Sequence, residues 1–489
     1  MFHPGQLVMV DIPGKRLDAE TAAFLREHQI RAVCLFRKNL GSEDEIRRLT
    51  ADLRAVMGEQ ALIGIDQEGG SVIRATSLPQ APAAMALGAV GDEALAEEVG
   101  AAVARGLRHL GINWNFAPVL DVNNNPANPV IGERSFGEDP ALVTRMARAW
   151  MRGSLREGVA CCVKHFPGHG DTHVDSHHAL PTVDKTEAEL EALELIPFRA
   201  LSPEAPAMMT AHIVYPQIDP EHPATLSHKI LSGILRQRMG YRGVVITDAL
   251  MMKAVHERYG HARAAVLALQ AGADMPLAQG SQAEQAAAIE AIAAALADGR
   301  LTTAQLQAAQ QRLDALAEAY PLAPRDYPTM QREADDALMH RGWERGLTAV
   351  GAAQAPDRSR PLRVLTQASV ASDGVSEAGL PAEEVAALFA AFDDVEFVHL
   401  VDLRRLQAGD LPRDERLNVL VSNHRGRFEA AARGAKVDLH LALWNPFQVM
   451  DIAAPAVVSW GYGEGALAAL RGWLEGRLAA TANAPVTLN

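Results

Sequence analysis

The sequence predicts an α/β fold in which a (β/α)8 barrel of the TIM type is followed by a smaller α/β sandwich domain. Three observations support this prediction. Short apolar runs alternate with longer helical patterns over the first two-thirds of the chain. The runs are apolar throughout, as in strands that are buried on both faces of a parallel sheet. No run leads into a G-x-G-x-x-G fingerprint, which disfavours an open dinucleotide-binding sheet.

Eight apolar runs are the predicted strands of the barrel. They span 6–12, 31–36, 61–68, 112–122, 159–166, 207–215, 243–250 and 272–278. Helical segments lie between them. In 42–57, Ser42 is a predicted N-cap with Glu45 three residues on, and 92–111 ends at Gly111, a predicted C-cap. Eight strand–helix units within roughly 280 residues match the size of a TIM barrel.

The chain divides into two predicted domains of unequal size. We expect a catalytic barrel over 1–320, a linker and connecting helix over 321–360, and the α/β sandwich over 361–489. The linker is indicated by the prolines of YPLAPRDYPTM (320–330). Beyond it, strands are predicted at 362–368, 395–401, 417–423, 438–444 and 456–462, and helices at 386–392 and 465–476.

Composition and charge exclude several classes of protein. The 489 residues are 48% hydrophobic and 22% charged, which is ordinary for globular proteins and excludes disordered, collagen-like and disulfide-scaffold chains. The 46 Lys and Arg against 60 Asp and Glu give a net charge of −14. We therefore expect no nucleic-acid partner, because such a partner needs a basic face. The oligomeric state is left open.

The cysteines and the N-terminal residues predict a cytoplasmic protein. Cys34, Cys161 and Cys162 are odd in number and two are adjacent, so reduced thiols are expected. The start MFHPGQLVMVDIPG lacks the basic residues and the apolar run of a signal peptide. No stretch approaches the ~18 apolar residues of a membrane span, so we expect no membrane contact.

Polar residues replace the apolar pattern where the predicted strands end. Catalytic groups of TIM barrels lie at the carboxyl ends of the strands. The candidates at those positions are Asp66, Glu68, Asp121, Lys164, His165, His212 and Asp248. A cap or loop role explains any single one about as well, but their shared edge of the barrel favours a site.

The densest polar segment is KHFPGHGDTHVDSHH (164–178), directly after the fifth predicted strand. Histidines recur every four residues, which would align metal ligands on a helix, at His165, His169, His173 and His177. Pro167, Gly168 and Gly170 argue against a helix there, so we expect no metal. The other interpretation is a dyad of Asp175 and His177, in which the carboxylate orients the imidazole for proton transfer.

These motifs resemble the β-N-acetylglucosaminidase branch of glycoside hydrolase family 3. KHFPGHGDTHVDSH is similar to the signature of that branch. Further blocks resemble the family in the same order, at IDQEGGSVIR (65–74), NFAPVLDV (115–122), VIGERSFGEDP (130–140), MTAHIVYP (209–216) and ITDALMM (246–252). The block that begins with LNVLVSN resembles the carboxyl-terminal sandwich of two-domain members.

The resemblance implies a retaining exo-β-N-acetylglucosaminidase without a cofactor. It would remove terminal β-linked N-acetylglucosamine from peptidoglycan fragments or chitooligosaccharides through a covalent glycosyl-enzyme. Asp248 would be the nucleophile, with His177 as general acid/base and Asp175 as its partner. The resemblance further implies that the sugar hydroxyls are bound by Asp66, Arg74, Arg134, Lys164 and His165. The residue chemistry agrees, because a retaining glycosidase needs an attacking carboxylate and a proton donor.

Four alternatives stay open. A β-glucosidase of the same family is disfavoured, because that branch typically shows SDW where this chain has TDAL. A phosphorylase is compatible with a histidine acid/base, which does not repel incoming phosphate as a carboxylate would. A metal-dependent barrel hydrolase would use the histidine run. A catalytically dead sugar-binding protein is disfavoured by the presence of Asp248, Asp175 and His177.

Overall fold

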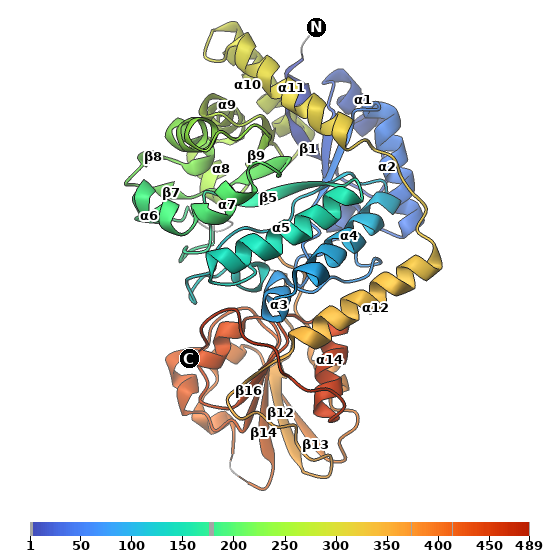
Figure 1. Ribbon diagram of the computed structural model, residues 1–489, viewed down its shortest axis with the longest axis vertical. Helices are drawn as coiled ribbons and strands as arrows, with labels where there is room; N and C mark the ends of the chain where they lie inside the picture. The colour runs from blue at the N-terminus through green and yellow to red at the C-terminus, as the bar shows by residue number, and fades with distance from the viewer. Residues whose placement is uncertain (1–2, 176–179, 373, 413, 489) are drawn as a thin grey trace.

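Eight parallel strands close into a barrel, each within one of the predicted apolar runs (Figure 1). They are β1 (Met9–Asp11), β2 (Ala32–Leu35), β3 (Leu62–Ile65), β4 (Trp114–Asn115), β5 (Ala160–Phe166), β6 (Ala207–Thr210), β9 (Val244–Ala249) and β10 (Met275–Leu277). β10 closes the barrel against β1, with Met9 opposite Leu277. The predicted fold class is confirmed. The computed structural model describes residues 3–175, 180–372, 374–412 and 414–488.

Helices cover the outside of this barrel. They are α1 (Ala19–Glu27), α2 (Glu43–Met57), α3 (Ala84–Val90), α4 (Glu93–His109), α5 (Pro140–Arg156), α6 (Glu187–Ala192), α7 (Leu195–Leu201), the helical segment Lys229–Arg238, α8 (Lys253–Tyr259), α9 (His261–Ala271), α10 (Gln282–Ala297) and α11 (Thr303–Ala319). Between β6 and β9 the chain adds a hairpin of β7 (Val214–Tyr215) and β8 (Asp219–Pro223), which the sequence did not predict.

The predicted helix caps are confirmed. The Ser42 hydroxyl accepts a hydrogen bond from the Glu45 N–H at 3.4 Å, and the Glu45 carboxylate accepts one from the Ser42 N–H at 3.0 Å. This reciprocal pair satisfies backbone donors that the first turn of α2 leaves free. Gly111 follows α4 with a φ of +77°, a left-handed conformation that favours glycine.

Buried polar side chains distinguish β5 from the apolar strands around it. All seven of its residues are buried, including Lys164 and His165 near its carboxyl end. A charged group in an apolar interior is costly unless it is paired and hydrogen-bonded. The partners of these two side chains therefore locate the polar site of the barrel.

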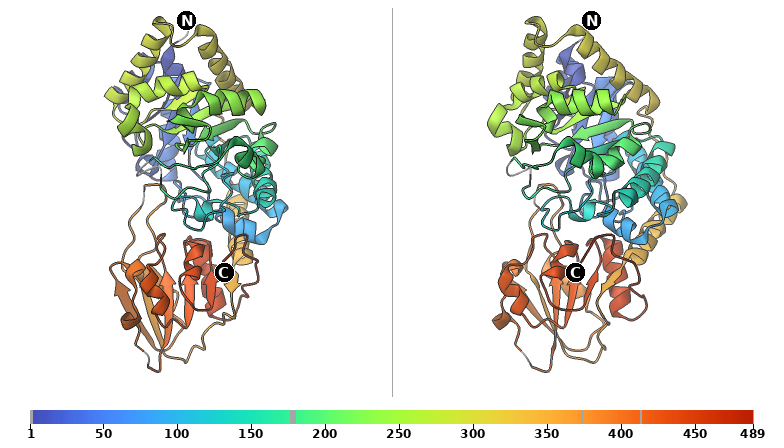
Figure 2. Two further views of the ribbon diagram at one scale, coloured as in Figure 1. Left: turned by 90° about the vertical axis from the view of Figure 1, so that its left-hand side faces the viewer. Right: turned by 60° about the vertical axis from the view of Figure 1, so that its left-hand side comes forward.

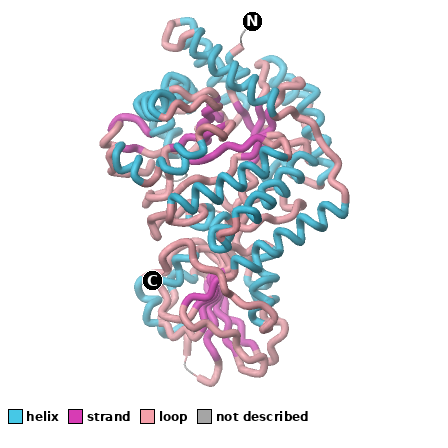
Figure 3. The backbone as a smooth tube through the Cα atoms, in the orientation of Figure 1, coloured by secondary structure: helices cyan, strands magenta, loops and turns pink. Residues whose placement is uncertain are grey.

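The second domain is a six-stranded mixed sheet covered on both faces (Figure 3). The strands are β11 (Thr348–Val350), β12 (Leu362–Gln367), β13 (Val395–Leu400), β14 (Leu417–Ser422), β15 (Leu439–Ala442) and β16 (Ala456–Val458), with helices α13 (Ala382–Ala387) and α14 (Glu464–Leu474). The order is β11-β16-β15-β14-β12-β13, with β11 antiparallel. Val364 and Leu365, neighbours on β12, join different apolar clusters, as expected for side chains on opposite faces of a sheet.

The two domains share an apolar cluster. α12 (Thr329–Gly346) runs from the barrel to the second domain and contacts α3, α4 and α14 (Figures 1 and 2). Its Trp343 packs in one cluster with Met85 of α3 and with Phe447 and Trp460 of the second domain. The Trp343 indole N–H donates to the Gln80 carbonyl at 3.2 Å. Apolar packing across the junction therefore fixes the second domain against the barrel.

No helix within the described ranges combines the length and the apolar character that a bilayer span needs.

Candidate active site

A pocket of about 150 Å³ lies at the carboxyl ends of the barrel strands. Six of the eight site residues predicted from the sequence line it, namely Asp66, Arg74, Arg134, Lys164, His165 and Asp248. They come from different parts of the chain. Asp66 follows β3, Lys164 and His165 lie in β5, and Asp248 lies in β9. The wall also contains Phe36 and Met252 from the barrel and Val375 from the second domain.

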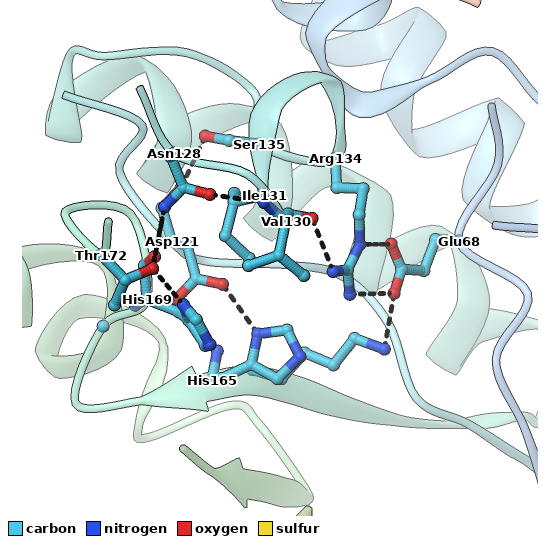
Figure 4. Close-up of polar contacts among 12 residues, drawn as sticks. Glu68, Asp121, Asn128, Val130, Ile131, Arg134, Ser135, His165, His169 and Thr172 are labelled. Atoms are coloured by element: carbon cyan, nitrogen blue, oxygen red, sulfur yellow. Dashed lines mark hydrogen bonds and ion pairs between the residues drawn. The ribbon is translucent and has the colours of Figure 1, made fainter. Parts of the chain in front are cut away.

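Glu68 is the centre of a buried ion-pair network among residues that line the pocket, and Figure 4 shows its contact with Arg134. Arg134 binds both carboxylate oxygens of Glu68, with Nε and Nη2 each at 2.9 Å. The Lys164 Nζ lies 2.6 Å from Glu68 Oε1 and donates to Asp66 Oδ1 at 2.7 Å. Arg134 also donates to the Val130 carbonyl at 3.1 Å. Every charge of the network thus has an opposite partner.

The network controls the ionisation of its members. Burial alone would raise the pKa of Glu68, but the charges of Arg134 and Lys164 outweigh it and hold that pKa well below its usual value. Burial alone would lower the pKa of Lys164, but Asp66 and Glu68 outweigh it and raise that pKa. The Glu68 carboxylate and the Lys164 ammonium therefore stay charged at neutral pH, as fixed polar groups for a sugar must.

Asp121 organises the backbone and the histidine at the end of β5 (Figure 4). Its Oδ1 accepts hydrogen bonds from the backbone N–H of His165 at 3.1 Å and of His169 at 2.7 Å. Its Oδ2 lies 2.8 Å from the His165 Nδ1. This contact assigns a proton to Nδ1 and orients the His165 ring, which lines the pocket. The Lys164–His165 peptide bond is cis.

His169 is a buried neutral imidazole. Burial and the neighbouring His165 lower the pKa of His169 to about 4. Its Nδ1 lies 2.9 Å from the Thr172 hydroxyl. The Asn128 amide donates to the His169 carbonyl at 2.8 Å. These contacts hold the start of the segment that follows β5, called the histidine loop from here on (167–178), against the barrel.

The described part of the histidine loop is not a helix, as Pro167 and the glycines predict. His165 lies in β5, and residues 167–175 contain turns but no helix. At Gly170 a Cβ atom would lie 1.7 Å from the Val122 carbonyl oxygen, so the loop approaches the barrel too closely for any side chain. Within the described ranges no group of three or more His, Cys, Asp or Glu side chains is arranged to hold a metal ion.

The predicted dyad is only partly described. Asp175 is 8% exposed and does not line the pocket. His177, the predicted general acid/base, lies outside the described residues.

Asp248 presents its carboxylate at the end of β9, half-buried in the pocket wall. Its Oδ1 accepts the N–H of Ala249 at 2.7 Å. The residues on either side are held to the barrel. The Thr247 hydroxyl accepts the N–H of Leu277 at 2.9 Å, and the Ala249 carbonyl lies 2.9 Å from the His212 Nε2. A carboxylate on such a fixed strand end can be held in line with a reacting carbon.

A loop of the second domain completes the pocket wall. It follows β12, and its residues Gly374 and Val375 line the pocket. Val375 packs on barrel residues Val72, Val130 and Ile131. The guanidinium of Arg74 donates to the Val375 carbonyl at 2.7 Å and to the Glu377 carboxylate at 2.9 Å.

Several residues of the site carried no assigned role in the sequence prediction. Glu68 and Asp121 were recognised as polar strand ends, yet their partners depend on the closed barrel. Phe36 is the last residue of a predicted strand, but a single phenylalanine there gave no functional signal. Val375 and Glu377 lie in the second domain, and no sequence pattern linked them to the barrel.

Known proteins are similar to this chain in both sequence and fold. The model of the glycosyl hydrolase family 3 N-terminal domain matches residues 3–316. A β-hexosaminidase of Bordetella avium is 38% identical over 286 residues, which cover 57% of this chain and 81% of that protein. Beta-hexosaminidase A of Pseudoalteromonas piscicida is 36% identical over 339 residues, 62% of this chain, and the match spans only 56% of that relative.

Solved structures extend the likeness to the second domain. A family 3 β-N-acetylglucosaminidase from Paenibacillus sp. str. FPU-7 superposes with a TM-score of 0.87 at 33% identity, covering 99% of this chain and 98% of that one. A β-glucoside phosphorylase superposes with a TM-score of 0.83 over 99% of this chain and 93% of its own, but at 22% identity this likeness shows a shared fold alone. The match to the family model over most of the barrel shows that the chain belongs to glycoside hydrolase family 3.

Proposed function

We propose that the protein is a retaining exo-β-N-acetylglucosaminidase that works through a covalent glycosyl-enzyme intermediate. The observation that carries the proposal is the position of Asp248. Its carboxylate stands at a fixed strand end and faces the same pocket as the paired groups Asp66, Lys164 and Glu68. The name of the Paenibacillus β-N-acetylglucosaminidase supports N-acetylglucosamine as the sugar, and the β-hexosaminidase names of the sequence relatives agree with it.

Asp248 and His177 divide the chemistry in this proposal. An Asp248 oxygen attacks the anomeric carbon while the bond to the leaving oxygen breaks, and His177 gives that oxygen a proton. Water then attacks the same carbon and gives a proton to His177, which releases Asp248 and restores the β configuration. Asp175 would orient His177 as a neighbouring carboxylate orients an imidazole.

The remaining predicted residues would bind the sugar that fills the pocket. Arg74, Arg134 and Lys164 supply charged N–H donors, and Asp66 supplies acceptor oxygens for hydroxyl groups. His165 is oriented by Asp121 and presents its other ring nitrogen. Since Asp66 and Lys164 are already fixed by each other, little ordering is needed when the sugar binds.

Water rather than phosphate is the proposed second nucleophile. Each of the three pocket cations is paired with a carboxylate, Arg134 and Lys164 with Glu68 and Arg74 with Glu377. These pairs offset the positive charge that a phosphate dianion would require. Turnover of chitobiose in phosphate and in a non-phosphate buffer, with analysis for N-acetylglucosamine 1-phosphate, separates the two reactions.

The natural substrate is proposed to be an imported cell-wall or chitin fragment met in the cytoplasm. Cys34, Cys161 and Cys162 are free and buried, and burial raises the pKa of the Cys161 thiol to about 12. Buried thiols of this kind fit a reducing compartment. The values of kcat/KM for chitobiose and for a disaccharide of N-acetylglucosamine with anhydro-muramic acid show whether chitin or cell-wall fragments are the better substrates.

The proposed function is tested by the Asp248→Asn variant on an aryl N-acetyl-β-glucosaminide. The wild type should hydrolyse this substrate and leave the corresponding aryl β-glucoside nearly untouched. Asp248→Asn keeps the shape of the side chain, so it should fold normally and lose activity by at least about a thousandfold. Near-normal turnover in this variant, or a wild type that prefers the glucoside, would overturn the proposal.

A further inference from the structure

Arg74 is a barrel residue whose side-chain partners come from the second domain. Its Nη1 donates to the Glu377 carboxylate at 2.9 Å, and its Nη2 donates to the Val375 carbonyl at 2.7 Å. The Arg74 backbone is fixed by the barrel itself, because its N–H donates to the Gln67 side chain at 2.9 Å. The Arg74 side chain is 9% exposed and lines the pocket.

We propose that Glu377 is a positioning residue that holds the Arg74 guanidinium against the sugar in the pocket. The inference rests on the proposed function, in which Arg74 donates to a sugar hydroxyl. Glu377 is not among the residues that line the pocket, so it acts through Arg74. The second domain thereby supplies one of the determinants of substrate affinity.

The chemistry of the guanidinium explains why such a partner matters. It carries five N–H donors in one plane, on a side chain with many rotamers. Two acceptors from the second domain, the Glu377 carboxylate and the Val375 carbonyl, fix that plane and leave other donors for a ligand. A donor that is fixed beforehand loses less conformational entropy when the sugar binds.

The charge of Glu377 contributes separately from its geometry. Arg74 is nearly buried beside the cations Arg134 and Lys164 in the same pocket. A buried cation without a counter-charge is costly, and it would swing toward solvent or toward a carboxylate of the pocket. The carboxylate of Glu377 removes that tendency.

The loop that carries Glu377 is held by contacts that do not use the Glu377 side chain. The Glu377 N–H donates to the Ser71 carbonyl at 3.0 Å, and the Tyr462 hydroxyl donates to the Glu377 carbonyl at 3.1 Å. Arg425 donates to the Ser376 hydroxyl at 3.1 Å and to the Val130 carbonyl at 2.6 Å. A change confined to the Glu377 side chain therefore leaves the loop docked.

The test compares Glu377→Ala, Glu377→Gln, Arg74→Ala and the double variant Arg74→Ala/Glu377→Ala in the full chain. The substrate is 4-nitrophenyl N-acetyl-β-glucosaminide. We expect Glu377→Ala to lower kcat/KM about tenfold, mostly by raising KM, because the Arg74 contact exists before and during the reaction. Arg74→Ala should lose about a hundredfold, and the double variant should lose no more, since Glu377 acts through Arg74. Glu377→Gln keeps an acceptor oxygen and should recover part of the loss.

The matched control is Glu138→Ala, which removes another carboxylate that joins the domains. The Glu138 carboxylate accepts a hydrogen bond from the Thr487 hydroxyl at 2.7 Å and one from the Thr487 N–H at 3.0 Å. This control should keep wild-type kcat/KM. The positioning role is overturned if Glu377→Ala matches the wild type, if its loss adds to that of Arg74→Ala, or if the control loses as much. A wild type without activity would instead overturn the proposed function, and the positioning role with it.

Discussion

Lys164 and Asp66 lie 98 residues apart in the chain, and the Nζ of Lys164 stands 2.7 Å from the carboxylate of Asp66. The contact exists because β5 and the end of β3 meet at the same rim of the closed barrel. The same ammonium lies 2.6 Å from Glu68. One buried cation thus holds two carboxylates together in the pocket that Asp248 also lines.

Removing this cation should harm both the fold and the reaction. Lys164→Met keeps most of the side-chain volume but leaves Asp66 and Glu68 without the ammonium between them. Breaking a buried ion pair on one side costs about 3–5 kcal/mol, so we expect a loss of that size in the free energy of unfolding and hydrolysis near background. Denaturant unfolding and the aryl glycoside assay measure the two effects.

An exposed ion pair supplies the control for Lys164→Met. Arg345 lies 2.9 Å from Asp92, and its side chain is 50% exposed. Arg345→Met should cost less than about 1 kcal/mol, because solvent screens such pairs. Equal losses in the two variants would contradict the buried network.

The lowered pKa of Glu68 predicts how stability changes with pH. The folded-state pKa lies well below the ordinary value, because Arg134 and Lys164 outweigh the effect of burial. The stabilisation is therefore complete above about pH 4.3 and is lost as the pH falls further, since the unfolded chain then takes up a proton that the folded chain does not. Urea unfolding of wild type and Glu68→Gln should show a constant gap from about pH 7 to about pH 5 that shrinks toward about pH 3. A gap that persists unchanged into acid would be the opposite result.

A substitution at Gly170 tests whether activity depends on the close approach of the histidine loop to the barrel. A Cβ atom there would meet the Val122 carbonyl at 1.7 Å, so Gly170→Ala must displace the loop. We expect hydrolysis to fall at least about tenfold with a lowered melting temperature. Gly14→Ala, where the nearest atom would be 3.9 Å away, should change neither quantity. Wild-type kinetics in Gly170→Ala would show that the loop position does not matter.

His177 as the proton donor predicts a dependence on the leaving group. His177→Ala should retain much more activity on an activated aryl glycoside than on chitobiose, because a good leaving group needs little protonation. The ratio of kcat/KM for the two substrates, compared with that of the wild type, measures the effect. Equal losses on both substrates would argue against the acid role.

The barrel could be predicted from the sequence because its strands are continuous apolar runs. Each of β5, β6 and β9 lies inside a predicted run, and the polar strand ends Asp66, Lys164 and Asp248 do line one pocket. The strong signal comes from burial on both faces of the sheet, which leaves no alternation. Local helix caps such as Ser42 with Glu45 could be predicted equally well, since the two partners are three residues apart.

Long-range partners could not be predicted in the same way. Arg74 and Glu377 are 303 residues apart, and nothing in either local sequence indicates that a loop of the second domain enters the pocket. Helix α13 shows a local limit. The apolar pattern predicted 386–392, whereas the helix spans Ala382–Ala387, and Phe389 and Phe392 beyond its end pack into the core of the second domain. These phenylalanines are apolar because they are buried by tertiary contacts, and their spacing resembles that of a helix.

Trapping the glycosyl-enzyme tests the central claim most directly. A 5-fluoro-N-acetylglucosaminyl fluoride should react quickly at the anomeric carbon and then hydrolyse slowly, because the ring fluorine disfavours positive charge in both steps while the fluoride leaves easily. Peptide mapping by mass spectrometry should place one N-acetylglucosaminyl label on Asp248. A label on another residue, or no label while the reagent is turned over, would contradict a retaining mechanism with Asp248 as the nucleophile.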